Sequence, residues 1–577
     1  MQFLKNSAFG VVLVLFAIVI ASSWPLFRSD MFFTHDFVHG VRIAEMARAL
    51  RDGHFPVRWS SNFGYGYGMP LFEFYAPLPF YVGSIFYLLG VPLLISSKLL
   101  FLLPNILTAM GAYLLGRKIG GVKGGLLAAA IITLAPYRGM NLFIRGAVSE
   151  TWGIMSLIWV LYATVLTINK NTYGAVLLIV SMISLYLSHN LTVVIGLPFV
   201  TLWTLVWIWQ ESKVDNHSWR INWRTSLRHI LILVWCHILS IGIASFYLLP
   251  LFSEKDFTKV ESATTGGYFN YQLHFLYIRQ LFRTEWGYGG SEWGPNDKLP
   301  FFLGYAQYLG LLVGFVATLF AGWKAFYKKE IQHHKNFWIL SVAMFSVALA
   351  LFMAVGKSQP LWDALSFMKY IQFPWRYYTV VIIFMGIAAA LGIQHLPKKW
   401  SFAKTLLIVL LALSINWQYF RPENYLEDAK LLYYDDGTRV QTHMSGILPD
   451  YIPKTLAAGI TPPQQLVTCE KIACEHLTII QNLTAKKVFT LDLQKSEQVI
   501  LSIAQYPGWK VKVNGQEQSI STTKDGLIAV LLPPGKHTVT VLFGSTPLRK
   551  LADTISLVSC IIFVGWIFWT KKNYDRN

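Results

Sequence analysis

The sequence has few charged residues and few cysteines. Only 14% of its 577 residues are Asp, Glu, Lys or Arg, and 54% are hydrophobic, whereas a soluble globular chain is about a quarter charged. Two of the four cysteines, Cys236 and Cys560, lie inside apolar segments. The other two, Cys469 and Cys474, are spaced too widely for a CxxC metal motif, and a local disulfide between them is left open. This composition is typical of a membrane protein.

Motifs of several common chemistries are also absent. There is no Walker A lysine loop, no GxSxG elbow and no HExxH pair, so ATP hydrolysis and zinc proteolysis have no support. Lys5 precedes an apolar run over residues 8–23, but no A-x-A cleavage signal follows this run. We therefore expect the run to be a retained first membrane helix.

Long apolar segments predict the membrane architecture. A helix needs ~20 residues to cross a hydrocarbon layer of ~30 Å, and on that measure we predict about twelve spans. The predicted spans are 8–27, 97–116, 122–137, 150–168, 172–188, 190–209, 229–251, 304–327, 337–356, 376–395, 402–420 and 551–570.

The net charge of +19 indicates the orientation of the helices in the membrane and not a nucleic-acid partner, because Lys and Arg concentrate in short loops beside apolar segments. The segment 77–95 is long enough to cross but is interrupted by proline and glycine. If it lies in the outer interface, the basic loops all face the cytoplasm, as the positive-inside rule requires. This predicts a multi-pass protein of the bacterial cytoplasmic (inner) membrane with both termini in the cytoplasm.

Three parts of the chain are expected. They are a multi-helix membrane domain (1–420) with outer loops 28–96 and 252–303, an extracytoplasmic β-rich domain (421–550), and a final transmembrane helix with a cytoplasmic basic tail (551–577). In the second part, apolar and polar residues alternate with period two, and Asn514-Gly515 is a hairpin turn signal. The pattern predicts antiparallel strands in a β-sandwich or jelly-roll-like domain.

The first outer loop contains a candidate catalytic acid. Asp36 follows the first predicted helix and is flanked by His35. A carboxylate just outside the membrane can act as a general base for a hydroxyl nucleophile. The alternative is that Asp36 caps the helix that follows it, by accepting hydrogen bonds from free backbone amides.

Other candidates would bind substrate. Between Asn62 and Tyr81, glycines alternate with aromatics, including Tyr65 and Tyr67, and Glu73 is the acid of this stretch. Its flat apolar faces suit a lipid chain or a sugar ring, or equally an aromatic belt without a ligand.

Two arginines at predicted outer helix ends, Arg145 and Arg376, could bind phosphate through paired hydrogen bonds. Alternatively, Arg145 pairs with Glu150, and Arg376 reaches toward lipid headgroups. His189 sits at another such helix junction.

Several motifs resemble known families. The path from Asp36 through Pro77-Leu-Pro-Phe-Tyr to Gly116-Arg117-Lys118 is similar to the front half of the GT-C superfamily of membrane glycosyltransferases. The motifs Gly64-Tyr-Gly-Tyr-Gly-Met-Pro-Leu-Phe-Glu-Phe-Tyr, Arg145-Gly-Ala-Val-Ser-Glu150, Gln372-Phe-Pro-Trp-Arg376 and Asp450-Tyr-Ile-Pro resemble bacterial membrane proteins labelled 6-pyruvoyl-tetrahydropterin synthase-related. The tail motif Tyr506-Pro-Gly-Trp resembles the terminal β-domain of large proteins proposed to glycosylate bacterial surface polymers.

The GT-C resemblance implies a polyprenyl-phosphate sugar donor, a glycan or lipid acceptor in the cell envelope, and surrounding membrane lipids as partners. It assigns the role of the base to Asp36. No DxD motif occurs in the first outer loop, so no cofactor is assigned and a divalent metal is left open. Pterin synthases use a three-histidine zinc site that this sequence does not assemble, so we do not expect pterin chemistry.

A non-catalytic protein is the rival interpretation. A membrane carrier, flippase or scaffold for surface-polymer assembly could keep the fold without the chemistry. A transporter is expected to place polar residues at mid-membrane, and the central predicted helices carry few.

Overall fold

The computed structural model describes residues 8–574, except 172, 215–219, 331, 396–397, 445–449, 471–473 and 475. The N-terminal residues 1–7, which include Lys5, and the last three residues of the predicted basic tail lie outside this range.

Nine helices in the described part of the chain are long and apolar enough to cross a membrane. They are α2 (Ala8–Ser23, continued by the 3-10 turn η1, Trp24–Phe27), α6 (Leu93–Thr133), α8 (Val148–Ile168), α10 (Asn190–Glu211), α11 (Trp223–Ser253), α13 (Tyr305–Gly322), α14 (Gln332–Ala354), α16 (Tyr378–Gly392, preceded by the turn η9, Pro374–Tyr377) and α19 (Pro547–Tyr574). The fold class, a multi-pass helical membrane protein with a C-terminal β-domain, is confirmed. The number of spans stays a prediction.

Three shorter apolar helices complete the bundle: α5 (Leu78–Leu88), α9 (Gly174–Ser188) and α17 (Lys398–Asn416). At 1.5 Å per residue, α5 is roughly 16 Å long and too short to cross alone. The backbone of α6 breaks at Gly121, where φ is +66°, so its two parts match two of the predicted spans.

Burial separates the central helices from the peripheral ones. In the most apolar stretch of the segment around α16, 94% of the residues are buried inside the protein, against 11% in that of α19. In a membrane, apolar side chains that are not covered by protein face lipid. We therefore regard α16 as the centre of the bundle and α19 as a helix at its edge.

Short helices occur in the segments that connect the long helices. They are α3 (His39–Arg51), α4 (Leu71–Phe74), α7 (Pro136–Phe143), α12 (Val260–Thr265), α15 (Gln359–Ala364) and α18 (Gly437–Arg439).

Two antiparallel sheets form the β-domain. One has the order β1-β4-β8-β7 and the other β2-β3-β9-β5-β6. The strands are β1 (Val467–Cys469), β2 (Thr478–Leu483), β3 (Lys486–Leu493), β4 (Glu497–Ala504), β5 (Trp509–Val513), β6 (Gln516–Gln518), β7 (Ser521–Thr522), β8 (Leu527–Leu532) and β9 (Gly535–Phe543). Burial alternates along β3 and β4 with period two, as expected for strands with one face in a core.

Local details of this domain also follow from its sequence. Val513 pairs with Gln516, so Asn514 and Gly515 form the two-residue turn between β5 and β6, and both have positive φ. Cys469 and Cys474 form a disulfide.

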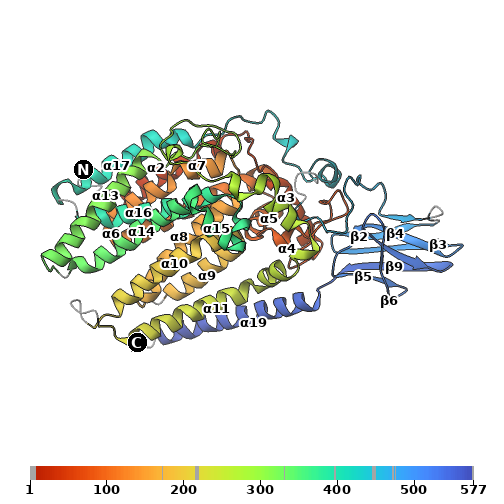
Figure 1. Cartoon of the computed structure of the whole chain (residues 1–577). Coiled ribbons are helices and arrows are strands. Elements are labelled where there is room, and N and C mark those ends of the chain that lie inside the picture. Colours follow the sequence, from red (N-terminus) through yellow and green to blue (C-terminus); the bar gives the residue numbers. More distant parts are fainter. Residues whose placement is uncertain are drawn as a thin grey trace.

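The sheets extend from one end of the helical bundle (Figure 1). The helices α3, α4 and α5 lie at this end, and α19 runs back from the sheets alongside α11 to the opposite end, where α2 also begins. The Ser556 hydroxyl of α19 accepts a hydrogen bond from the Phe246 amide of α11 at 2.7 Å. The described ends of the chain therefore share the end of the bundle that is farthest from the β-domain.

Candidate active site

Asp36 lies in the loop just before α3, at the end of the bundle that adjoins the β-domain. Its carboxylate accepts hydrogen bonds from Arg42, whose Nη1 lies 3.2 Å from Oδ1 and 3.1 Å from Oδ2, and from the Tyr75 hydroxyl at 3.4 Å. The Arg42 guanidinium is buried and stacks on the Tyr75 ring at 4.2 Å from its centroid. The Asp36 side chain remains 31% exposed, so it is bound on one side and accessible on the other.

The capping alternative for Asp36 is wrong. Helix α3 begins at His39, its N-cap is Val38, and no side chain caps it. Asp36 lies two residues before this cap, and its carboxylate is bound to Arg42 and Tyr75 instead.

The loop of Asp36 pairs with the turn between α7 and α8. The amide of His35 donates to the Ile144 carbonyl and the amide of Asp36 to the Arg145 carbonyl, each at 2.9 Å. Gly146 permits this approach, because a Cβ there would lie 2.5 Å from the Asp36 carbonyl oxygen and φ is +66°. The pairing brings the loop of Asp36 next to the loop of Arg145.

Charge around Asp36 keeps its carboxyl ionised. Burial raises the pKa of Asp36, but Arg42 and His39 outweigh this effect and hold the pKa below its usual range. Burial lowers the pKa of His39, and its Nε2 lies 2.6 Å from the Gly146 carbonyl oxygen, which can only accept. Near neutral pH the site therefore contains an ionised Asp36 and a neutral His39.

Glu150, in the first turn of α8, contacts two arginines from distant parts of the chain. Its Oε2 lies 2.8 Å from Arg145 Nη1 and 3.4 Å from Arg376 Nε. Its Oε1 accepts hydrogen bonds from the Tyr137 hydroxyl and, at 3.2 Å, from Asn141 Nδ2. We call Tyr137, Asn141, Arg145, Glu150 and Arg376 the arginine cluster.

The arginine cluster has one more positive than negative charge, since its two guanidinium groups share the single carboxylate of Glu150. Arg145 also stacks on Trp375 at 4.5 Å from the ring centroid. The alternative of an Arg145–Glu150 pair is thus present in the structure. Arg376 is only 8% exposed and does not extend toward lipid headgroups. A buried excess of positive charge favours an anionic group such as a phosphate.

Two predicted histidines flank these groups. His189 caps α10 by accepting a hydrogen bond at Nδ1 from the Thr192 amide, 3.2 Å away. His35 Nε2 lies 2.9 Å from the Tyr288 carbonyl oxygen.

Three other predicted residues lie elsewhere. Glu73 is fully buried, accepts a hydrogen bond from the Tyr506 hydroxyl at 2.8 Å and pairs with Arg549 at 3.1 Å. Tyr67 donates to the Thr461 carbonyl at 3.0 Å, and Tyr65, with φ of +60°, is partly buried against the core. We call residues 59–77 the aromatic loop. Glu73 joins this loop to Tyr506 and to α19, and Tyr67 joins it to β4 by accepting from the Ala504 amide at 2.8 Å. None of the three residues has a contact with Asp36 among the described interactions.

Some residues of the site were not assigned from the sequence. Tyr137 and Asn141 are spaced by four within α7, which places them on one face of that helix. Arg145 continues the spacing into the turn that follows, and this spacing was a signal that could have found the first two. Tyr75 had no such signal, because its approach to Asp36 depends on the path of the whole aromatic loop.

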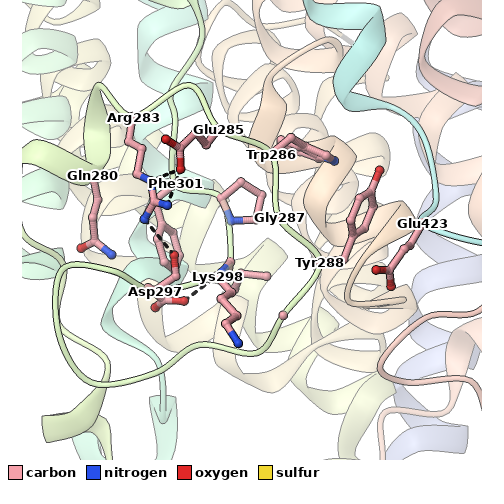
Figure 2. A pocket seen from close by; sticks show the side chains of 13 residues that line it. Gln280, Arg283, Glu285, Trp286, Gly287, Tyr288, Asp297, Lys298, Phe301 and Glu423 are labelled. Atoms are coloured by element: carbon pink, nitrogen blue, oxygen red, sulfur yellow. Dashed lines mark hydrogen bonds and ion pairs between the residues drawn. The ribbon is translucent and has the colours of Figure 1, made fainter.

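A cavity of about 540 Å³ adjoins this region in the loop 280–301 (Figure 2). Trp286 and Tyr288 lie on one side of it together with Glu423, and Arg283 pairs with Glu285 on the other side. Because Tyr288 contacts His35, the cavity borders the loop that carries Asp36.

A divalent metal site is left open by the sequence. Over residues 8–574 with the gaps given above, no group of three or more His, Cys, Asp or Glu side chains is placed to hold a metal ion. The nearest charged partners of Asp36 are Arg42 and His39.

Comparisons with known sequences give two matches. The model of a family described as bacterial membrane protein YfhO matches residues 468–555, within the β-domain and the start of α19. A Lactococcus lactis subsp. cremoris protein is 24% identical over 299 residues, which are 48% of this chain and 47% of that protein. The chain thus matches about half the length of this relative.

Several solved structures have a similar arrangement. They include the mycobacterial arabinofuranosyltransferase AftD (TM-score 0.43, 14% identity, 73% of this chain and 28% of that chain), the apo Archaeoglobus fulgidus oligosaccharyltransferase (0.41, 12%, 72% and 56%), and Cupriavidus metallidurans ArnT bound to undecaprenyl phosphate (0.37, 15%, 70% and 63%). None of these matches carries the pterin synthase-related name. All three TM-scores are below 0.5.

Proposed function

We propose that this protein is a membrane glycosyltransferase that moves a sugar from a polyprenyl-phosphate donor to an extracytoplasmic acceptor, either a cell-surface glycan or a lipid. The observation that carries the proposal is an ionised, partly exposed carboxylate, Asp36, whose loop pairs with the loop of a buried cluster of excess positive charge. Asp36 would be the general base and the cluster would be the anion site. Transfer from a phosphate-linked sugar requires both.

In the proposed reaction, Asp36 accepts the proton of the acceptor hydroxyl. A carboxylate of low pKa is a weak base, so it takes the proton late, when attack on the anomeric carbon has made the hydroxyl acidic. Arg42 and Tyr75 hold the carboxylate in one orientation and leave its accessible side to the acceptor.

The donor phosphate departs as an anion, so no general acid is needed. Arg145 and Arg376 would stabilise the charge that grows on this group, and donors fixed before the reaction are effective because they need no reorganisation. Glu150, Tyr137 and Asn141 would keep the two guanidinium groups in place.

The proposal includes a location. It requires the end of the bundle near the β-domain to face outward from the bacterial cytoplasmic membrane, with both termini in the cytoplasm. The division into a membrane domain (1–420), an outer β-domain (421–550) and a final helix (551–577) belongs to the same proposal.

The test is the surface glycan composition of a deletion strain complemented with wild type, Asp36→Asn or Asp30→Asn. Asp30 is a matched control, because it is an exposed acid of the same loop that pairs with Arg28 at 3.2 Å. We expect wild type and Asp30→Asn to restore the lost sugar and Asp36→Asn to fail, since loss of a general base slows a reaction by roughly 100-fold or more.

Two results would contradict the proposal. If the deletion changes no envelope glycan, the protein is not a surface glycosyltransferase. If the deletion removes a sugar and Asp36→Asn restores it at wild-type protein levels, Asp36 has no chemical role and the carrier or scaffold interpretation takes precedence.

A further inference from the structure

A second cavity, of about 280 Å³, lies between the aromatic loop and the β-domain. Tyr67 and Trp59 contribute from the loop, Asn482 from β2, Lys487 from β3 and Trp509 from β5. The catalytic proposal does not use this cavity. We call it the β-domain cavity.

The lining of the β-domain cavity is rich in side-chain amides. Asn62, Gln441, Gln464, Gln465 and Asn482 all border it, and the last three of these are exposed, so the cavity opens to solvent. An amide both donates and accepts hydrogen bonds, as a sugar hydroxyl does. A few convergent polar groups of this kind are what a specific ligand site requires.

The charges around the cavity nearly cancel. Arg48 and Lys487 are positive, Asp52 is negative, and Arg48 pairs with Glu45 at 3.2 Å. Asp52 itself accepts hydrogen bonds from the amide and hydroxyl of Thr484 at 2.6 and 2.7 Å. A phosphate-bearing ligand would be favoured by excess positive charge, so this balance favours a neutral ligand.

One buried donor at the cavity has no partner. Trp509 is 5% exposed, it lines the cavity, and its Nε1 has no hydrogen-bond acceptor among the residues that the structure describes. Buried donors in folded proteins are normally paired.

The cavity has a defined position relative to Asp36. Arg42, which holds Asp36, lies near the start of α3, and Asp52, which lines the cavity, directly follows its last residue, Arg51. Ten residues of helix span about 15 Å. Arg48, which also lines the cavity, is closer, six residues or about 9 Å along the helix from Arg42. A glycan chain of several rings can reach from the cavity to Asp36.

We propose that the β-domain cavity is a distal binding site for a neutral oligosaccharide or polysaccharide, which holds the acceptor chain while its end lies near Asp36. This inference rests on the proposed function for its role and deepens it, because it makes the acceptor a neutral glycan chain and not a lipid or a single sugar.

Binding to the purified full-length protein in detergent tests the inference without activity. The probes are the neutral polysaccharide fraction from the envelope of the deletion strain and, as an anionic comparison, a glycerol phosphate polymer. The variant Gln465→Ala/Asn482→Ala changes two exposed side chains of the cavity, and Gln518→Ala, on the exposed strand β6, is the matched control.

We expect the neutral fraction to bind wild type, Gln518→Ala and Asp36→Asn equally and to bind the double variant at least 10-fold more weakly. Absence of binding, full binding by the double variant, or equal binding of the glycerol phosphate polymer would each overturn the inference. Failure of the proposed function is distinguishable: in that case Asp36→Asn restores the envelope sugar in cells, whatever the cavity binds in the purified protein.

Discussion

Two carboxyl groups near the β-domain end of the bundle are held in opposite protonation states. Asp36 accepts two hydrogen bonds from Arg42 and has His39 nearby, and its pKa is lowered although burial acts to raise it. Glu73 is more deeply buried and shares Arg549 with Glu254. Burial raises the pKa of Glu73 to about 8, since Arg549 opposes the shift but Glu254 adds to it. Near neutral pH, Asp36 is therefore ionised and Glu73 is mostly protonated.

This difference predicts a pH dependence of stability. Glu73 has a folded pKa of about 8 and an ordinary value of 4.5, so the stability it contributes is fully present below pH 4.5 and is lost as pH rises through 8. We expect the unfolding temperature of wild type, relative to Glu73→Gln, to fall between pH 5 and pH 8. The measurement is thermal unfolding in detergent across this range.

The exposed acid Glu261 on α12 provides the control, as Glu261→Gln should keep the wild-type pH profile. Parallel curves for wild type and Glu73→Gln would show that Glu73 does not titrate between folded and unfolded states in this range.

At the scale of elements, the turn between α7 and α8 decides whether the site forms. Helix α7 presents Tyr137 and Asn141 to Glu150 on α8, and the turn between these helices pairs through its backbone with the loop of Asp36. Gly146 lies where the two loops are in close contact, because a Cβ added there would be 2.5 Å from the Asp36 carbonyl oxygen. The geometry of the site therefore depends on a backbone contact as well as on charged side chains.

Substitution of Gly146 by alanine should disturb the site by more than the energetic cost of its positive φ. In Gly146→Ala, positive φ costs about 1–2 kcal/mol, and the new Cβ would also meet the Asp36 carbonyl oxygen at 2.5 Å. Gly53→Ala is a matched control, because Gly53 has φ of +77° and no atom within 4 Å of the added Cβ.

We expect both alanine variants to lower the unfolding temperature, and only Gly146→Ala to lose complementation of the glycan defect. If both variants complement equally, the contact between the two loops is not needed for function.

At the scale of the whole molecule, the last helix connects the β-domain to the bundle. Arg549, near the start of α19, contacts Glu73 of the aromatic loop, Glu254 after α11 and, at 3.0 Å, the carbonyl of Pro507 before β5. Arg58 pairs with Asp553 of the same helix at 2.6 Å. The β-domain is thus attached to the bundle by buried charged contacts at the end where Asp36 lies.

The arrangement predicts opposite sides of the membrane for two exposed sites. Asn514, in the β5–β6 turn, should face outward, and Tyr173, in the loop between α8 and α9, should face the cytoplasm. In a Cys560→Ser background, a membrane-impermeant maleimide should label Asn514→Cys on intact protoplasts. It should label the control, Tyr173→Cys, only after permeabilisation. The reverse pattern would invert the proposed topology.

The sequence by itself determined the class of protein and much of its local structure. Runs of about twenty apolar residues indicated membrane helices, and alternation with Asn514-Gly515 indicated strands and a hairpin. These signals are local, because helix and strand periods are set by neighbouring residues. The confirmed fold class rests on them.

Only the tertiary structure decided which polar groups meet. Asp36 binds Tyr75 and is not a cap, Arg376 reaches Glu150, and Glu73 joins the β-domain to α19 instead of the region around Asp36. Each contact joins segments far apart in the chain. Such contacts depend on how the helices pack and how the loops cross between them, and no local pattern of residues specifies that packing.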